Sequence, residues 1–263
     1  PLVHVSHSTR ALGHSFIDTF NDGHDDKKWD ISDFVVKDGI FRNRWSKKNV
    51  KFSAGGEMTL SINRARSGPM PFSAGEYQNK DWTRYGRYEA IMKAAPGSGV
   101  VTGFFTYTGP YFDDPHDEID IEFLGNRRDI IQFNVFTDGQ PLGGEQYRLP
   151  YDASREYHLY AFEWRPDKVS WFIDDVKIYE LSAEEFDIPQ TPQRLIAQVW
   201  TGEYYKWHGH PRFHDGARAS IRCMSYRRVG DTTSPECGDR WDLLDSNVKP
   251  VRSAREVKHV ASR

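Results

Sequence analysis

A rhythm of short β-type segments constrains the fold of this chain more than any other feature. Residues 158–164, 169–174 and 177–181 (HLYAFEW, VSWFID and KIYEL) are separated only by short turns, which predicts three consecutive strands. Residues 130–139 and 195–200 have the same character. Because few segments have the spacing of a long amphipathic helix and no βαβ alternation is present, the sequence predicts an all-β, antiparallel sandwich or barrel.

The length of the chain favours one large domain. A sequence of 263 residues suits a single all-β domain better than two small ones. We predict a main domain over residues 1–230 and a C-terminal extension over residues 231–263, because the last segment is polar and mixed in charge. That extension either packs on the domain or is partly disordered towards its end. Ser182, followed by two acids, predicts one short helix over residues 182–186.

Charge and hydropathy argue against two classes of partner. The formal net charge of −3 disfavours a nucleic acid, and no apolar run approaches the roughly 18 residues of a membrane helix. We also expect a monomer. The chain starts at Pro1 and shows no charged-then-apolar signal segment, so we expect a mature or trimmed chain of a secreted or periplasmic protein. Aromatic residues make up 14% of the sequence, and they serve both as core and as flat surfaces for sugar rings.

The segment HDEIDIEFLG, residues 116–125, places three carboxylates two residues apart. On a strand, Glu118, Asp120 and Glu122 share one face while the apolar residues between them point to the core. Like charges along one face repel each other and cost stability. Two glutamates leaning over the middle aspartate would bring their carboxyls to roughly 5–6 Å, near the separation in a retaining glycosidase. A solvated acidic strand or a cation site is the alternative.

The segment EIDIEFLG resembles the active-site signature of glycoside hydrolase family 16, and its surroundings resemble the bacterial lichenases, the endo-β-1,3-1,4-glucanases. Similar segments are GFFTYTGP, YGRYEAIMK and YHLYAFEW, and the resemblance runs from about Phe16 to Tyr226. It implies a β-jelly-roll sandwich with a substrate cleft across its concave face. It also implies Glu118 as nucleophile, Asp120 as assisting carboxylate and Glu122 as general acid/base, without a cofactor.

The same resemblance assigns further side chains to the cleft. The positions that match cleft aromatics, a substrate-binding Asn and a cleft-edge segment in the lichenases are Phe105, Tyr107, Trp200, Trp207, Asn134 and Glu76. For each aromatic residue the alternative is core packing, which is the commoner role of a Trp in a β-sandwich. The resemblance shifts Trp207 and Tyr107 towards the cleft more than Phe105.

Three positions depart from the lichenase pattern on the glycone side of the cleft. Arg42 replaces a sugar-binding Asn, Gln78 replaces an Arg and His116 replaces a Trp. We treat all three as substrate-binding candidates and expect a β-glucan-like bacterial exopolysaccharide, branched or acid-bearing, because Arg42 offers donors that pair with a carboxylate. The alternatives are a solvated rim position for Arg42 and a cleft-edge side chain for His116.

Two cysteines leave the redox state open. Cys223 and Cys237 either form one disulfide, which fits an oxidising compartment, or stay free. The positions of the lichenase disulfide are occupied by Asn43 and Ala74, so that bridge is absent.

We predict no metal site. By the resemblance, Arg222 stands where many relatives place a calcium-binding Asp, and a cationic side chain does not ligate calcium. His208, His210 and His214 form a loose cluster, but the segment has loop character and Asp215 is its only neighbouring carboxylate. A cleft contact or a solvated loop explains these histidines better than a metal does.

These patterns together predict a retaining endo-β-glucanase that cuts internal β-1,4 bonds in β-1,3-1,4-glucan or a related polysaccharide. A transglycosylase is one rival, because a sugar hydroxyl can intercept the same covalent intermediate. A non-catalytic carbohydrate-binding relative is a second, although binding alone does not require three repelling carboxylates. A structural surface protein would explain neither the carboxylates nor the aromatic residues.

Overall fold

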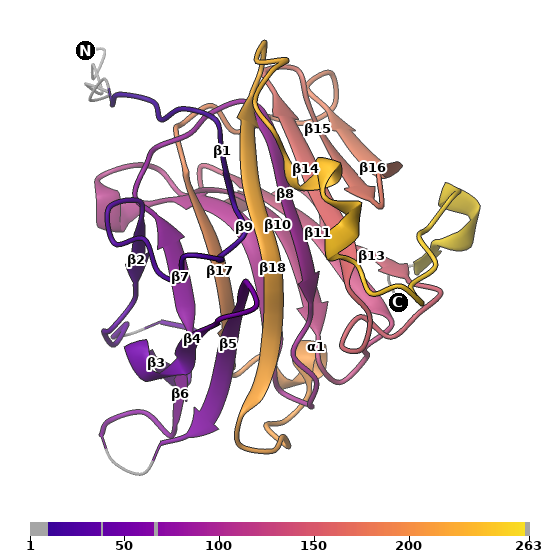
Figure 1. Cartoon of the computed structure of the whole chain (residues 1–263). Helices are drawn as coiled ribbons and strands as arrows, with labels where there is room; N and C mark the ends of the chain where they lie inside the picture. The colour runs from indigo at the N-terminus through magenta and orange to yellow at the C-terminus, as the bar shows by residue number, and fades with distance from the viewer. Residues whose placement is uncertain (1–9, 38, 66–67, 261–263) are drawn as a thin grey trace, which may run out of the picture.

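Two large β-sheets account for the strands in residues 10–37, 39–65 and 68–260, the part of the chain that the computed structural model describes (Figure 1). The ten-stranded sheet contains, in spatial order, β16 (Val176–Ser182), β15 (Lys168–Ile173), β14 (His158–Arg165), β8 (Gly86–Lys93), β18 (Ala217–Arg228), β5 (Glu57–Arg64), β6 (Phe72–Ala74) and β3 (Asn43–Trp45), with β1 (Phe16–Asp18) beside β18 and β4 (Val50–Ser53) beside β5.

The nine-stranded sheet contains β19 (Lys258–Val260), β13 (Glu145–Arg148), β11 (Ile130–Thr137), β10 (Asp117–Leu124), β9 (Val101–Thr108), β17 (Arg194–Trp200), β7 (Glu76–Asn79) and β2 (Trp29–Ile31), with β12 (Gln140–Pro141) beside β11. The helical turns are α1 (Tyr205–His208), η1 (Lys47–Asn49), η2 (Pro110–Phe112), η3 (Cys237–Asp239), η4 (Trp241–Leu243) and η5 (Ala254–Glu256). None of the helices in the described ranges has the length and apolar character that a membrane crossing requires.

The strand pattern confirms the predicted fold class, an antiparallel β-jelly-roll sandwich. Among the strands that the structure describes, β3 and β6 are the one parallel pair. The three consecutive strands predicted from residues 158–181 are β14, β15 and β16. The helix predicted over residues 182–186 is wrong, because Ser182 ends β16 and the next residues form a turn. A segment of this length is too short to nucleate a helix without packing support.

The two sheets pack face to face through aromatic side chains. Phe133 on β11 stacks on Trp171 on β15 with 5.5 Å between ring centroids, and Phe123 on β10 lies edge-on to Tyr160 on β14 at 4.8 Å. Trp171 Nε1 also donates a hydrogen bond to the carbonyl oxygen of Asp120 at 3.0 Å. These contacts hold β10 from the core side and leave its opposite face to point outward.

The C-terminal segment, residues 231–260, follows the flank of the sandwich from the ten-stranded sheet to β19 (Figure 1). A disulfide joins Cys223 on β18 to Cys237, with 5.8 Å between their Cα atoms. Arg222 Nη1 donates to Asp245 Oδ1 at 2.8 Å, and β19 pairs with β13. Of the two alternatives for the cysteines, the structure therefore contains the disulfide. The division of the chain at residue 230 stays a prediction.

Candidate active site

Strand β10 carries its three carboxylates on the face that points away from the core. Ile119, Ile121 and Phe123 alternate with them and are 0%, 0% and 2% exposed, because a strand turns successive side chains to opposite faces. On the outer face, Glu118 and Glu122 are half-buried and the Asp120 side chain is buried between them. The hydrogen-bonded neighbours β9 and β11 fix this strand on both sides.

The register of the sheet arranges the outer-face side chains in three rows across the strands. The rows consist of Arg194, Tyr107, Glu118 and Phe136; of Gln78, Ile196, Phe105, Asp120 and Asn134; and of Glu76, Gln198, Gly103, Glu122 and Gln132. Besides the three carboxylates, five residues predicted for the cleft lie on this face, and they come from three strands: Glu76, Gln78, Phe105, Tyr107 and Asn134. The carboxylates therefore occupy the middle of a continuous polar and aromatic surface.

The environment of the cluster raises the pKa values of Asp120 and Glu122. Burial raises the pKa of Asp120 well above its usual range, and the charges of Glu118 and Glu122 and a hydrogen bond with Glu118 add to this. Burial, followed by the charge of Glu118, raises the pKa of Glu122 to about 8. Asp120 and Glu122 therefore hold protons near neutral pH.

Residues 38–216 match Glycosyl hydrolases family 16. The chain belongs to this family. The chain is 41% identical over 180 residues to a β-glucanase of Acetivibrio thermocellus, covering 68% of this chain and 52% of that protein. It is 40% identical over 197 residues to a β-glucanase of Brevibacillus brevis, covering 73% of each. The chain thus spans about half the length of the first of these relatives.

Solved structures give the same family relationship. The β-glucanase of Bacillus licheniformis superposes with a TM-score of 0.77 at 34% identity, covering 83% of this chain and 100% of that chain. A β-1,3-1,4-glucanase (lichenase) from a mouse hindgut metagenome superposes with a TM-score of 0.78 at 33% identity, covering 82% and 100%. The carboxylate strand lies inside the matched family region, residues 38–216.

His116 directly precedes the family-16 carboxylate strand and contacts its first glutamate. The imidazole Nε2 lies 2.6 Å from Glu118 Oε2. The ring stacks on Phe136, with 4.8 Å between centroids and 16° between planes, and leans against Tyr107 at 5.4 Å. Of the three departures from the lichenase pattern, this is the one that touches a carboxylate of the cluster.

Glu76 and Gln78 are bound to each other at the β7 side of the sheet. Gln78 Nε2 and Ser32 Oγ each donate to Glu76 Oε1 at 2.6 Å. Burial raises the pKa of Glu76 to about 7. The amide of Gln78 is therefore oriented by Glu76. The two side chains form a fixed polar pair at the β7 side of the carboxylates.

The aromatic candidates divide into packing and surface residues. Trp200 is 3% exposed and packs in the core against Phe41 and Trp207, at centroid distances of 5.3 Å and 5.9 Å. The predicted substrate contact of Trp200 is therefore corrected to a supporting role, because a buried ring has no face left for a sugar. Trp207 is half-buried, and its Nε1 donates to Gln132 Oε1 at 2.8 Å. Phe105 is 6% exposed and forms the floor beside Asp120.

Arg42 lies on the rim and is already paired. Its Nη1 donates to Glu203 Oε1 at 2.6 Å, and its side chain is 45% exposed. Its backbone N–H donates to the carbonyl oxygen of Thr201, which places it beside the loop that leads to α1. Because Glu203 already occupies one of its donors, the guanidinium of Arg42 has fewer donors left for an acidic substrate.

Some outer-face residues were missed by the sequence analysis. Gln132 and Gln198 stand in the row of Glu122, and Arg194 stands in the row of Glu118. The period-two rule applied outward from Asn134 would have found Gln132. Arg194 has no motif of its own; its guanidinium lies 5.1 Å from the Trp82 ring, on a segment far away in sequence.

The histidines at positions 208 and 210 are engaged in other contacts. His208 is buried, and burial lowers its pKa, while His210 stacks on Tyr205 at 4.3 Å. Within the described ranges, no three His, Cys, Asp or Glu side chains are grouped so as to hold a metal ion. Arg222 lies over the ring of Tyr157 at 3.7 Å and binds Asp245.

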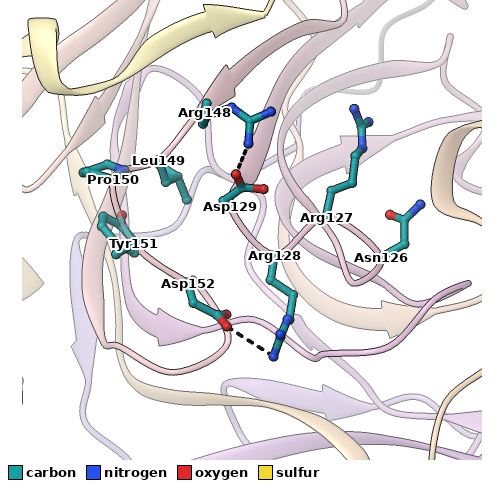
Figure 2. Close-up of a pocket in the computed structure, with 9 residues that line it drawn as sticks. All are labelled: Asn126, Arg127, Arg128, Asp129, Arg148, Leu149, Pro150, Tyr151 and Asp152. Carbon is teal, nitrogen blue, oxygen red and sulfur yellow. Dashed lines mark hydrogen bonds and ion pairs between the residues drawn. The ribbon is translucent and has the colours of Figure 1, made fainter.

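A hollow of about 670 Å³ lies between the β10–β11 turn and the segment that follows β13 (Figure 2). Its arginines are balanced by neighbouring aspartates: Arg148 pairs with Asp129, and Arg128 pairs with Asp152 at 3.2 Å. Arg127 points towards β13 and donates to Gln146 Oε1. None of the three carboxylates of β10 lines this hollow, so it is separate from the carboxylate face of the nine-stranded sheet.

Proposed function

We infer that this family-16 protein is a retaining endo-β-glucanase that cuts internal β-1,4 bonds in β-1,3-1,4-glucan or a related bacterial exopolysaccharide. The observation that carries this proposal is geometric: Glu118, Asp120 and Glu122 share the outer face of one strand, in the middle of a polar and aromatic surface. The pKa of Glu122, raised to about 8 by burial, makes this residue the proton donor of the pair. A retaining glycosidase needs one carboxylate as nucleophile and one carboxylic acid as proton donor. The names of the relatives, β-glucanase and lichenase, support the substrate class.

The first step forms a covalent intermediate. Glu122 donates its proton to the glycosidic oxygen, and Glu118 attacks the anomeric carbon of the glycone. The carbon–oxygen bond to the aglycone breaks, and the aglycone leaves as an alcohol that carries the proton of Glu122. Asp120, protonated and hydrogen-bonded to Glu118, orients the nucleophile.

The second step releases the sugar. Glu122, now a carboxylate, takes a proton from water, and the water oxygen attacks the anomeric carbon. The ester bond to Glu118 breaks, the nucleophile recovers its charge and Glu122 recovers its proton. Two inversions give net retention, and the chemistry needs no groups beyond these side chains and water.

The altered glycone side supports a polymer other than plain mixed-linkage glucan. Gln78 and His116 replace the Arg and Trp expected from the lichenase pattern, and both side chains are held by carboxylates of the chain. We therefore expect the enzyme to cleave the exopolysaccharide faster than mixed-linkage glucan, whose backbone is related. The disulfide between Cys223 and Cys237 supports a secreted or periplasmic location, since such bonds persist in oxidising compartments.

Product analysis on barley mixed-linkage β-glucan tests the proposal. The wild type should release short oligosaccharides with a β-1,3-linked glucose at the reducing end, and initial products should have the β anomeric configuration. Glu118→Gln should lower the rate by about 10⁴-fold or more. The matched control is Glu163→Gln, a strand glutamate paired with Arg165, which should keep wild-type rates. Products longer than the substrate would make the enzyme a transglycosylase, and no cleavage of any β-glucan would refute the hydrolase.

A further inference from the structure

We propose that His116 is a positioning residue for the nucleophile: its imidazole holds one oxygen of Glu118 so that the other faces the anomeric carbon. This inference rests on the proposed function, because it assigns the imidazole a task within the same reaction. It differs from the substrate-binding role that the sequence suggested for this position, since the group that His116 touches is a catalytic carboxylate. The 2.6 Å contact between Nε2 and Glu118 Oε2 carries the argument.

The imidazole is immobilised from several directions. Phe136, the neighbour of Glu118 on β11, stacks on one face of the ring, and Tyr107, its neighbour on β9, leans against the ring. The backbone carbonyl of His116 accepts a hydrogen bond from Gly139 N at 2.8 Å. The same two aromatic residues thus flank the nucleophile and hold its partner. A hydrogen bond from a fixed ring costs little further ordering and orients its acceptor well.

Glu118 is held on two sides. Asp120 forms a hydrogen bond with it from within the strand, and His116 contacts Oε2 from the position two residues earlier. Because the carboxylate is the acceptor, Nε2 carries the proton. In the first step this N–H keeps its bond while the other oxygen of Glu118 attacks. In the glycosyl-enzyme, the N–H donates to the ester carbonyl, and it donates to the carboxylate again when the ester breaks. No proton leaves the imidazole.

The charged and titratable groups around the ring come from three strands. On β10, Glu118 contacts it, while the carboxylate of Asp117 projects the other way and accepts from the backbone of Asp138 and Thr191. On β9 the neighbour is the Tyr107 phenol, whose pKa is raised by burial and by Glu118.

Beyond Tyr107, on β17, stands Arg194. Glu118 is therefore the carboxylate that the imidazole faces directly, and removing the imidazole should act on Glu118 first.

The pH profile of kcat/KM distinguishes positioning from substrate contact. His116→Phe keeps a ring between the two aromatic neighbours and removes the donor. We expect kcat to fall about tenfold with KM changed by less than about twofold, as for a lost hydrogen bond to a charged group. The acid limb should move to higher pH, because a hydrogen bond to the charged form favours ionisation of a carboxylate. His116→Gln, whose amide nitrogen reaches the place of Nε2, should restore most of both effects.

The matched control is a second His–Glu pair outside the site. His259 on β19 contacts Glu145 on β13 and lies beside Tyr147. His259→Phe should leave kcat, KM and the acid limb unchanged. A rise in KM with an unchanged kcat and acid limb in His116→Phe would make His116 a substrate contact and overturn the proposal. Equal losses of kcat in His116→Phe and His116→Gln, without a shift of the acid limb, would show that His116 only packs, and would also overturn the proposal.

A measurement without substrate separates this proposal from the proposed function. In proton NMR of ¹⁵N-histidine-labelled protein, the Nε2–H of His116 should be protected from exchange in the wild type. It should be exchange-broadened in Glu118→Ala, while the Nε2–H of other histidines is unchanged. His116→Gln, which lacks the imidazole, assigns the resonance. If the wild type cleaves no β-glucan but this dependence is present, the function fails and the pairing stands. If the resonance is indifferent to Glu118→Ala, the positioning role is refuted even in an active enzyme, and this also decides the case in which His116→Phe does not fold.

Discussion

The two sheets surround their carboxylates with different partners. Glu89, on β8 of the ten-stranded sheet, is 0% exposed, and its carboxylate is met by Arg87 Nε at 2.5 Å, Gly238 N at 2.7 Å and Ser225 Oγ at 3.4 Å. Asp120 and Glu122, on β10 of the nine-stranded sheet, have no arginine or lysine partner among the described residues, and the charges that act on them are those of other carboxylates.

The difference shows what each burial is for. A buried carboxylate stays charged when cations and N–H donors compensate its lost hydration, and it then ties segments together. A carboxylate that loses hydration and faces only other carboxylates keeps its proton, which costs stability but leaves an acid at neutral pH. Glu89 thus anchors the C-terminal segment through Gly238, whereas Glu122 is suited to proton transfer.

Among the changes that test this comparison, removing the acid should give the largest effect. Glu122→Gln should lower kcat on β-glucan by about 10³-fold, because a positioned general acid contributes on this order. An aryl glycoside with a good leaving group should lose much less. In the wild type, kcat/KM should fall as the pH rises through about 8, where Glu122 loses its proton, and this basic limb should be absent from the variant. A basic limb that persists in Glu122→Gln would assign the acid to another residue.

Removing the compensated glutamate should cost stability and not chemistry. Glu89→Gln leaves Arg87 without its buried partner, so we expect the free energy of unfolding to fall by about 3 to 4 kcal/mol. The activity per folded molecule should be unchanged. Urea denaturation of this variant beside Glu163→Gln, whose pair with Arg165 is partly exposed, measures the contrast. Equal stabilities of the two variants would contradict it.

The disulfide reinforces the same region. Cys223 and Cys237 are 14 residues apart, and opening a loop of this size costs about 2 to 3 kcal/mol. Replacing both cysteines by serine should lower the melting temperature without moving the pH profile of kcat/KM. Thermal unfolding with and without a reductant gives an independent measure on the wild type.

Two glutamates with raised pKa values should make the protein sensitive to alkali. The folded-state pKa values of Glu76 and Glu122, about 7 and about 8, lie above the usual value of a glutamate. Between the usual pKa of a glutamate and these raised values, the folded state binds more protons than the unfolded state. The free energy of unfolding therefore falls as the pH rises through this range. We expect the melting temperature to drop by a few degrees between about pH 5 and pH 9, and to drop less in Glu122→Gln. A melting temperature that rises over this range would be inconsistent with the buried, protonated state.

The smallest effect should come from the rim. Arg42→Ala removes an exposed ion pair with Glu203, and such pairs contribute little. KM for neutral β-glucan should change by less than about twofold. The ratio of rates on neutral and acid-bearing polymers should also stay constant, and a marked change in that ratio would return Arg42 to substrate recognition.

The sequence by itself determined the strands and the shared face of the carboxylates. Both depend on the alternation of neighbouring side chains, as in Ile119 and Ile121 between Glu118, Asp120 and Glu122, and this pattern is local. The motif also pointed to the family, because the family's chemistry lies in those few consecutive residues.

Only the tertiary structure decided which side chains are available and how they are charged. Trp200 is buried, and Arg42 is paired with Glu203, 161 residues away in sequence. Phe136 holds His116 from another strand. Burial and long-range partners set each of these states, as they set the pKa of Glu122, and no local pattern encodes them. The residue types of the site could therefore be predicted from the sequence, whereas their protonation and contacts depend on segments that meet only in the folded sandwich.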